Sequence, residues 1–117
     1  MACMTPLETA QRYVDLVAVQ DFAAIPVLFA PDAVWRPAPP QPEVRGAALI
    51  DAGYRALAER DVPPMRVVER SFYVDGDTVV AEFSCETEGV LSEVVDVFTF
   101  DSAGLIRRMS AYTRPGS

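Results

Sequence analysis

Residues 93–100 read Glu93-Val-Val-Asp-Val-Phe-Thr-Phe100, a stretch typical of a strand with apolar side chains on both faces. Strict alternation divides its side chains between two faces, with Val94, Asp96, Phe98 and Phe100 on one and Val95, Val97 and Thr99 on the other. An ionised carboxylate among valine and phenylalanine would cost several kcal/mol unless it were paired or neutralised. Asp96 therefore either faces solvent at an open spot or stays inside as a neutral acid that donates a hydrogen bond.

The length and charge of the chain limit its organisation and its partners. With 117 residues, half of them hydrophobic, it should form one domain over residues 1–117 around one core. Seventeen acidic residues against ten basic ones give a net charge of −7. Because an acidic surface repels nucleic acid and anionic membranes, we expect neither as a partner.

The chain has no histidine, which removes the commonest metal ligand and the commonest general base. Proton chemistry would therefore depend on carboxyl and phenol groups, and we expect no metal and no cofactor. Cys3 and Cys85 are poorly placed for a disulfide or a metal site, which favours a reduced, cytoplasmic protein. The N-terminal residues do not resemble a secretory leader, and no apolar run approaches membrane-spanning length.

The first half of the chain predicts helices. Thr5, Pro6 and Glu8 have the spacing of a capping box with proline at the first helical position. Apolar residues then recur at helical spacing, with Tyr13 at the edge of the stripe that Leu7, Ala10, Val14 and Val17 form. These signals predict a helix that begins at Pro6.

Two more helices are expected before the sheet begins. Asp21 would cap a short helix over residues 21–29, which Pro26 shortens or kinks. A brief strand at 32–36 runs into a loop at 37–42, because its prolines cannot continue a hydrogen-bonded ladder. The third helix is expected over residues 46–60, where the apolar stripe contains Ala47, Ile50, Tyr54 and Leu57.

The second half of the chain alternates with period two. This pattern predicts strands at 66–74, 78–88, 93–100 and 105–113, with turns at 75–76, 88–89 and 102–104. In the strand at 78–88, Val79, Ala81, Phe83 and Cys85 should face the core, and Glu82, Ser84 and Glu86 the solvent. The expected fold is α+β, with three N-terminal helices packed on a curved antiparallel sheet that encloses an apolar pocket.

Three side chains on the expected inner surface could carry chemistry: Tyr13, Tyr54 and Asp96. Tyrosines on a helix stripe are more often core residues with a satisfied hydroxyl, and a lone acid in a strand more often faces solvent. The residue pattern alone leaves both interpretations open.

Several stretches together resemble the bacterial Δ5-3-ketosteroid isomerases. They are residues 11–14 (Gln-Arg-Tyr-Val), 28–33 (Leu-Phe-Ala-Pro-Asp-Ala), 45–46 (Arg-Gly) with Tyr54, and 95–104 (Val-Asp-Val-Phe-Thr-Phe-Asp-Ser-Ala-Gly). These isomerases belong to the nuclear-transport-factor-2-like, or SnoaL-like, fold group, whose cystatin-like cone serves many activities. The resemblance covers nearly the whole chain and implies an isomerase that acts on a steroid or another polycyclic or phenolic ketone.

The resemblance also implies roles for the three side chains. The residues that match Tyr13 and Asp96 form an oxyanion hole in the family, where the acid is kept neutral, and the match to Tyr54 supports the first tyrosine through a hydrogen bond. When a proton leaves the carbon beside a ketone, two donors in a dry pocket stabilise the dienolate oxygen.

One position departs from the family. In an ungapped alignment, Pro37 stands where the isomerases carry the aspartate that acts as general base, and proline cannot accept a proton. A shifted loop could bring Glu43 inward as a substitute base, with Asp32 as a weaker candidate. Alternatively, the substrate or water serves as the base, or the pocket binds its ligand without turnover.

The expected pocket lining extends beyond these groups, to Trp35, Pro37, Phe83, Cys85, Phe98, Met109 and Ala111, although most of these residues could simply fill the core. Arg36, Arg45, Arg107 and Arg108 are expected to be solvated charges. The resemblance implies a homodimer, for which Val95, Val97 and Tyr112 on the outer sheet face would be suitable. Two other functions stay open: a SnoaL-like cyclase or epoxide hydrolase, and a binder of planar apolar ligands.

Overall fold

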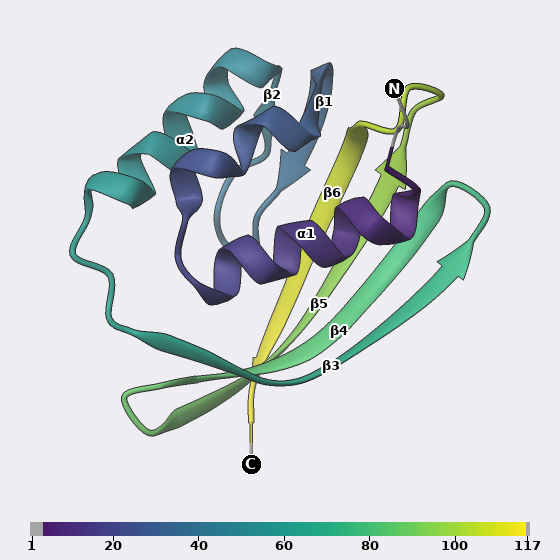
Figure 1. Ribbon diagram of the computed structural model, residues 1–117. Helices are drawn as coiled ribbons and strands as arrows, with labels where there is room; N and C mark the ends of the chain where they lie inside the picture. The colour runs from purple at the N-terminus through teal and green to yellow at the C-terminus, as the bar shows by residue number, and fades with distance from the viewer. Residues whose placement is uncertain (1–3, 117) are drawn as a thin grey trace.

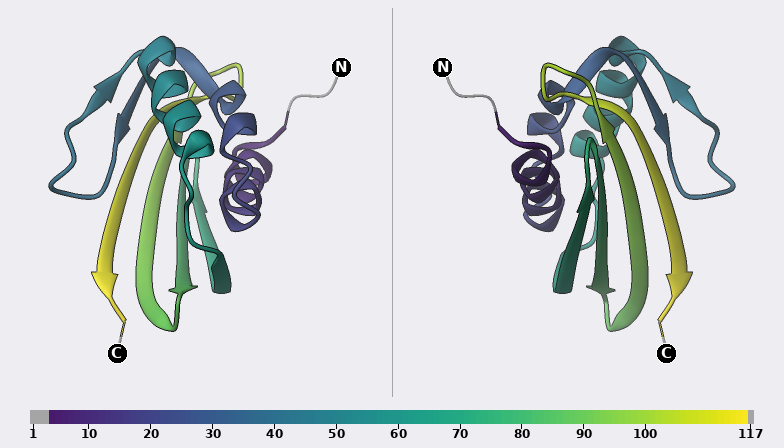
Figure 2. Two further views of the ribbon diagram at one scale, coloured as in Figure 1. Left: turned by 90° about the vertical axis from the view of Figure 1, so that its left-hand side faces the viewer. Right: turned by 90° about the vertical axis from the view of Figure 1, so that its right-hand side faces the viewer.

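The computed structural model describes residues 4–116, so the expectation for Cys3 lies outside the described part of the chain. The elements follow in the order α1 (Pro6–Ala18), two 3-10 turns η1 (Phe22–Ala24) and η2 (Pro26–Leu28), β1 (Phe29–Arg36), β2 (Val44–Arg45), α2 (Ala47–Glu59), β3 (Met65–Asp75), β4 (Thr78–Thr87), β5 (Val90–Phe100) and β6 (Ile106–Pro115). The strands form one sheet in the order β2-β1-β6-β5-β4-β3. The long strands bend, and α1 and α2 lie on the same side of the sheet (Figures 1 and 2). This is the predicted α+β architecture. Within residues 4–116, no helix has the length and apolar character needed to cross a membrane.

Helix α1 begins as predicted. The Thr5 hydroxyl accepts a hydrogen bond from the Glu8 backbone N–H (3.1 Å), and the Thr5 backbone N–H donates to Glu8 Oε1 (2.9 Å). This reciprocal pair satisfies two donors that the helix itself cannot use. Ala10, Tyr13 and Val14 are buried on the side of this helix that faces the sheet.

The predicted helix over residues 21–29 is wrong as one element, because the chain forms the two 3-10 turns there instead. Pro26 lacks a backbone N–H, and its ring would collide with the preceding turn of an α-helix. Asp21 makes no side-chain capping bond, and Phe29 is already extended at the start of β1. The tight turns bring β1 directly under α2.

The sheet also departs from the expected antiparallel pattern. Strand β1 pairs with β6 in parallel, in the register Trp35 with Met109, with a shift between Phe29 and Val34. The short strand β2 extends the sheet beyond β1, at a place where no strand was expected. Parallel pairing between segments so far apart in sequence leaves no local signal, so the sheet is mixed rather than antiparallel throughout.

The hairpin between β3 and β4 turns one residue later than predicted. Asp75 is still in the ladder, opposite Thr78, and Gly76 and Asp77 make the turn. Gly76 has φ of +60°, a backbone conformation that glycine adopts without steric cost. The next turn, at Glu88 and Gly89, lies where it was expected.

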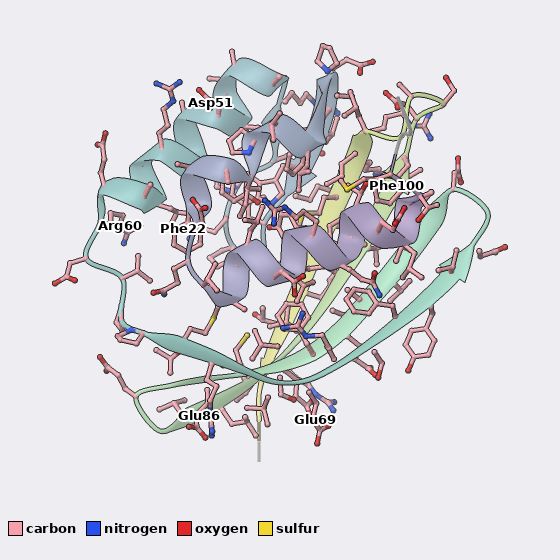
Figure 3. All side chains as sticks on the ribbon, viewed as in Figure 1. Phe22, Asp51, Arg60, Glu69, Glu86 and Phe100 are labelled. Carbon is pink, nitrogen blue, oxygen red and sulfur yellow. The ribbon has the colours of Figure 1, made fainter. Side chains whose placement is uncertain are left out.

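The alternation of β4 and β5 positions the site. In β4, Val79, Ala81, Phe83 and Cys85 are buried and Glu82 is exposed, as predicted. Glu69 and Glu86 point away from the helices, on the outer side of the sheet (Figure 3). In β5, the face with Asp96, Phe98 and Phe100 is buried, which places the carboxyl group of Asp96 in the core.

Candidate functional site

Two tyrosines meet between the helices. Tyr13 comes from α1 and Tyr54 from α2; both are buried, and their hydroxyl oxygens are 2.6 Å apart. Burial raises the pKa of both phenols, so both keep their protons at neutral pH. Since only one of the two protons is needed for the hydrogen bond between the tyrosines, the other can be donated to a third group.

Asp96 lies beneath this pair on β5. Asp96 is only 3% exposed, and burial raises the pKa of its carboxyl group from 3.8 to about 7. Its cross-strand neighbours on the two sides are Ala81 and Ala111, both of which have small side chains. A negative charge on Asp96 would raise the pKa of Tyr13 and Tyr54 further, which shows that the three groups lie within electrostatic reach of one another.

The predicted lining residues gather around this cluster. The rings of Tyr13 and Phe98 pack edge to face at 5.2 Å between centroids. Phe83, Cys85 and Met109 are buried, and Ala111 is half-buried against the same core. Burial, followed by the neighbouring Asp96 charge, raises the pKa of the Cys85 thiol, so this cysteine stays protonated. The cluster is therefore a mostly apolar environment with phenol and carboxyl groups at its centre.

Trp35 completes the aromatic part of the site. Its ring stacks on that of Tyr54 at 4.8 Å between centroids and 27° between planes. The sequence predicted that Trp35 faces inward, but it gave no signal of this stack, which depends on how β1 lies under α2. The stack adds a second contact to Tyr54, whose hydroxyl group is bonded to Tyr13.

Comparison with known proteins shows the family of this chain. The family model described as a SnoaL-like domain matches residues 10–109. The chain belongs to the SnoaL-like family. It is 37% identical over 109 residues to a protein named steroid Delta-isomerase from Nocardioides simplex, a match that covers 90% of this chain and 86% of that relative.

Solved structures share the fold of this SnoaL-like protein. A crystal structure of a steroid delta-isomerase from Pseudomonas aeruginosa has a TM-score of 0.70 at 25% identity, covering 94% of this chain and 80% of that one. A protein with a cystatin-like fold from Silicibacter pomeroyi has a TM-score of 0.71 at 24% identity, over 92% and 74% of the two chains. The predicted cone is thus confirmed.

Glu43 does not turn into the site of this SnoaL-like protein, so it is not placed to act as the substitute base. Glu43 is exposed, with one carboxylate oxygen 2.9 Å from Arg36 Nε and the other 2.6 Å from Arg45 Nε. The hydrogen bond from Arg36, together with Arg45, lowers the pKa of Glu43, which makes it a weaker base. Pro37 follows the end of β1 and is half-buried, and Asp32 is exposed. Neither Glu43 nor Asp32 is therefore placed among the buried tyrosines and Asp96.

Four arginines gather on the outer face of the sheet, a grouping that the sequence did not indicate. They share a cavity of about 360 Å³ that is lined by Asp32, Val34, Arg36, Arg45, Thr99, Arg107 and Arg108. The pairing of Val34 with both Arg45 and Arg108 brings three strands together at this point. All four arginines are exposed, as expected, and they lie on the face opposite Asp96.

Proposed function

We propose that this SnoaL-like protein enolises an apolar polycyclic ketone, with Tyr13 and Asp96 as hydrogen-bond donors to the ketone oxygen. The observations that support the proposal are the hydrogen-bonded pair of buried phenols and a buried carboxyl group, of pKa about 7, whose charge would raise the pKa of both phenols. The similarity to steroid delta-isomerases supports the same substrate class.

The chemistry follows from where charge develops. Removal of a proton from the carbon beside the ketone shifts negative charge to the oxygen, and donors already fixed in a dry site stabilise that charge without reorganisation. Tyr13 donates its hydroxyl proton, and the neutral carboxyl group of Asp96 donates its own. Tyr54 donates to the Tyr13 oxygen, which strengthens Tyr13 as a donor as charge develops.

The proton acceptor is the weak part of this arrangement. Within residues 4–116, Asp96 is the only buried acidic residue, and its carboxyl group already serves as a hydrogen-bond donor. The proton then passes to water or to a basic group of the substrate. A missing general base typically lowers the rate about 100- to 10,000-fold, so isomerisation should be slow.

The direct test is conversion of a Δ5-3-ketosteroid, followed by the ultraviolet absorbance of the conjugated ketone that forms. We expect conversion above the buffer rate and well below that of an isomerase with a positioned base. A rate equal to buffer alone, with a folded protein, would contradict catalysis.

The substitution Glu43→Gln should leave this rate unchanged, within about twofold, because Glu43 is exposed and paired with Arg36 and Arg45. The measurement is the initial rate of ketosteroid conversion for the variant and for wild type. Loss of activity in Glu43→Gln would instead make Glu43 the base and require the loop before β2 to move inward.

A second candidate function is binding without turnover, which the proline at position 37 specifically favours. A phenolic steroid would then bind to Tyr13 and Asp96 with a shift in its absorbance, while no ketosteroid is converted. A cyclase or epoxide hydrolase has less support, because such sites use a carboxylate dyad or a histidine. The chain has no histidine, and Asp96 is the one buried acidic residue between positions 4 and 116.

We also propose a homodimer through the outer sheet face. Tyr112 is 54% exposed there and pairs with Val95, which is half-buried. Apolar side chains on an outer sheet face are typical of a covered surface. Sedimentation velocity should give a dimer for wild type and a monomer for Tyr112→Lys; a wild-type monomer at micromolar concentration would contradict the proposal.

A further inference from the structure

The cavity of about 360 Å³ on the outer sheet face concentrates positive charge in an acidic chain. The net charge of the protein is −7, and of its ten basic residues four, Arg36, Arg45, Arg107 and Arg108, line this one cavity. Like charges held close together repel, so this arrangement destabilises the folded chain unless negative charge offsets it. The chemistry proposed for the inner face uses none of these residues.

A β-bulge in β6 puts two of the arginines on the same face of the sheet. Ile106 and Met109 are both buried, although residues three apart in a regular strand point to opposite faces. The strand contains one extra residue between them: in the pairing of β6 with β5, Arg107 has no partner, whereas the residues on both sides of it have one. Bulges redirect side chains in this way. As a result, the guanidinium groups of both Arg107 and Arg108 line the outer cavity.

Glu43 restricts the other two arginines. Its carboxylate oxygens lie 2.9 Å from Arg36 Nε and 2.6 Å from Arg45 Nε. One carboxylate shared between two guanidinium groups neutralises only one of their two charges. The three side chains together therefore keep a positive charge, and the ion pairs hold them beside the cavity.

The two arginines of the bulge are free to bind a ligand. Among residues 4–116, neither Arg107 nor Arg108 forms an ion pair, and both side chains are exposed. Asp32 is the one acidic residue in the lining of the cavity, and in the same part of the chain it forms no ion pair either. The cavity thus has more positive than negative groups, and solvent reaches them.

A phosphate group is the chemistry that this lining recognises best. Guanidinium groups present planar sets of N–H donors that match the oxygens of phosphate. The Thr99 hydroxyl group, also in the lining, adds a further donor. The volume of about 360 Å³ is near the lower end of the range for small-molecule sites, which suits a phosphate with a small organic group attached.

We infer that this cavity binds the phosphate group of a small phosphate monoester, with Arg107 and Arg108 as its main contacts. Arg36, Arg45 and Thr99 complete the lining around it. The acidic character of the whole chain disfavours a long polyanion such as nucleic acid at the same place. The inference goes beyond the proposed function and does not depend on it, because the cavity lies on the opposite face of the sheet from the buried carboxyl group.

The test is an NMR titration of the full chain with glycerol phosphate, with glycerol as the uncharged control, in buffer of low ionic strength that contains no phosphate. Wild type should bind glycerol phosphate and not glycerol, and added salt should weaken binding. The double variant Arg107→Gln, Arg108→Gln should bind at least about tenfold more weakly, because it lacks the charge-assisted hydrogen bonds of both guanidinium groups.

A matched control changes the net charge equally at another place. The double variant Arg55→Gln, Arg66→Gln removes two exposed arginines that do not line the cavity, and it should bind like wild type, within about twofold.

A third variant should bind more tightly. Asp32→Asn removes the negative charge from the lining without breaking an ion pair, and it should raise the affinity about two- to fivefold. Since misfolding does not increase affinity, this variant keeps the test decisive if the double variant of Arg107 and Arg108 fails to fold. An unchanged or lower affinity in folded Asp32→Asn would contradict the placement of the phosphate in this cavity.

The remaining outcomes identify other occupants. No binding of glycerol phosphate by wild type, or equal binding by the double variant of Arg107 and Arg108, would overturn the site. Binding only to vesicles of phosphatidylcholine and phosphatidic acid would overturn the small-molecule ligand, because the same chemistry would then come from a lipid headgroup. A double variant that loses the dimer, while wild type binds no phosphate ester, would assign the cavity to carboxylates of a second copy and overturn the inference. Asp96→Asn should leave phosphate binding unchanged, so each of the two sites can fail without the other.

Discussion

Replacing Tyr13 with phenylalanine should lower kcat for ketosteroid conversion about 100- to 1,000-fold, the effect of losing one oxyanion donor in other enzymes. The phenylalanine ring keeps the edge-to-face contact with Phe98 and the buried position on α1, so the fold should persist. What is lost is the hydroxyl proton that stabilises the dienolate oxygen. The measurement is the initial rate at saturating substrate, with circular dichroism to confirm folding.

The matched variant for this prediction is Tyr54→Phe. It removes the partner hydroxyl 2.6 Å from that of Tyr13 and leaves Tyr13 free to donate to the substrate. Its effect on kcat should therefore be clearly smaller than that of Tyr13→Phe. Equal losses would mean that the two hydroxyl groups act as a unit, and an unchanged rate in Tyr13→Phe would remove Tyr13 from the chemistry.

The second large effect concerns the pH dependence of stability. Burial raises the pKa of Asp96 from 3.8 to about 7. Between these pH values the unfolded chain has released this proton while the folded chain still holds it, so the free energy of unfolding falls as pH rises. A difference of this size contributes about 4 kcal/mol in all, and the loss is complete above pH 7.

Asp96→Asn should remove this pH dependence, because the amide does not titrate and keeps a similar shape. Urea unfolding at pH 5 and pH 8 should show wild type losing stability between the two values and the variant losing much less. Glu82→Gln is the control: it removes an acid from the exposed face of the adjacent strand and should keep the wild-type slope. Identical slopes for wild type and Asp96→Asn would mean that Asp96 is ionised and solvated in the folded protein.

The same titration bears on function. A carboxyl group donates a hydrogen bond only while it is protonated, so ketosteroid conversion should decline as pH rises through about 7. Asp96→Asn retains two N–H donors and should keep part of the activity without this decline. Stability and donation by Asp96 thus change over the same pH range, for the same reason.

Local patterns were sufficient to predict the parts of the site that depend on one element. Alternation in β5 placed Asp96 on the face of Phe98 and Phe100, and the core packs on that face. Tyr13 lies on the edge of a helix stripe that begins at a recognisable cap. Each of these predictions needs only the period of its own helix or strand.

The features that the sequence did not yield depend on contacts between distant segments. The parallel pairing of β1 with β6 and the stack of Trp35 on Tyr54 depend on where β1 lies relative to β6 and α2. Glu43 stays outside because two arginines, Arg36 and Arg45, bind its carboxylate. The spacing of residues within the loop does not predict these two ion pairs.

The most direct test of a buried, neutral Asp96 is a carbon NMR titration of its side-chain carboxyl group, assigned by comparison with Asp96→Asn. We expect a midpoint near pH 7 in the free protein. Binding of a phenolic steroid should shift the Asp96 carboxyl signal, and Tyr13→Phe should reduce this shift. A midpoint in the ordinary aspartate range of about 3.9, unaffected by the ligand, would contradict a buried, neutral acid acting beside Tyr13.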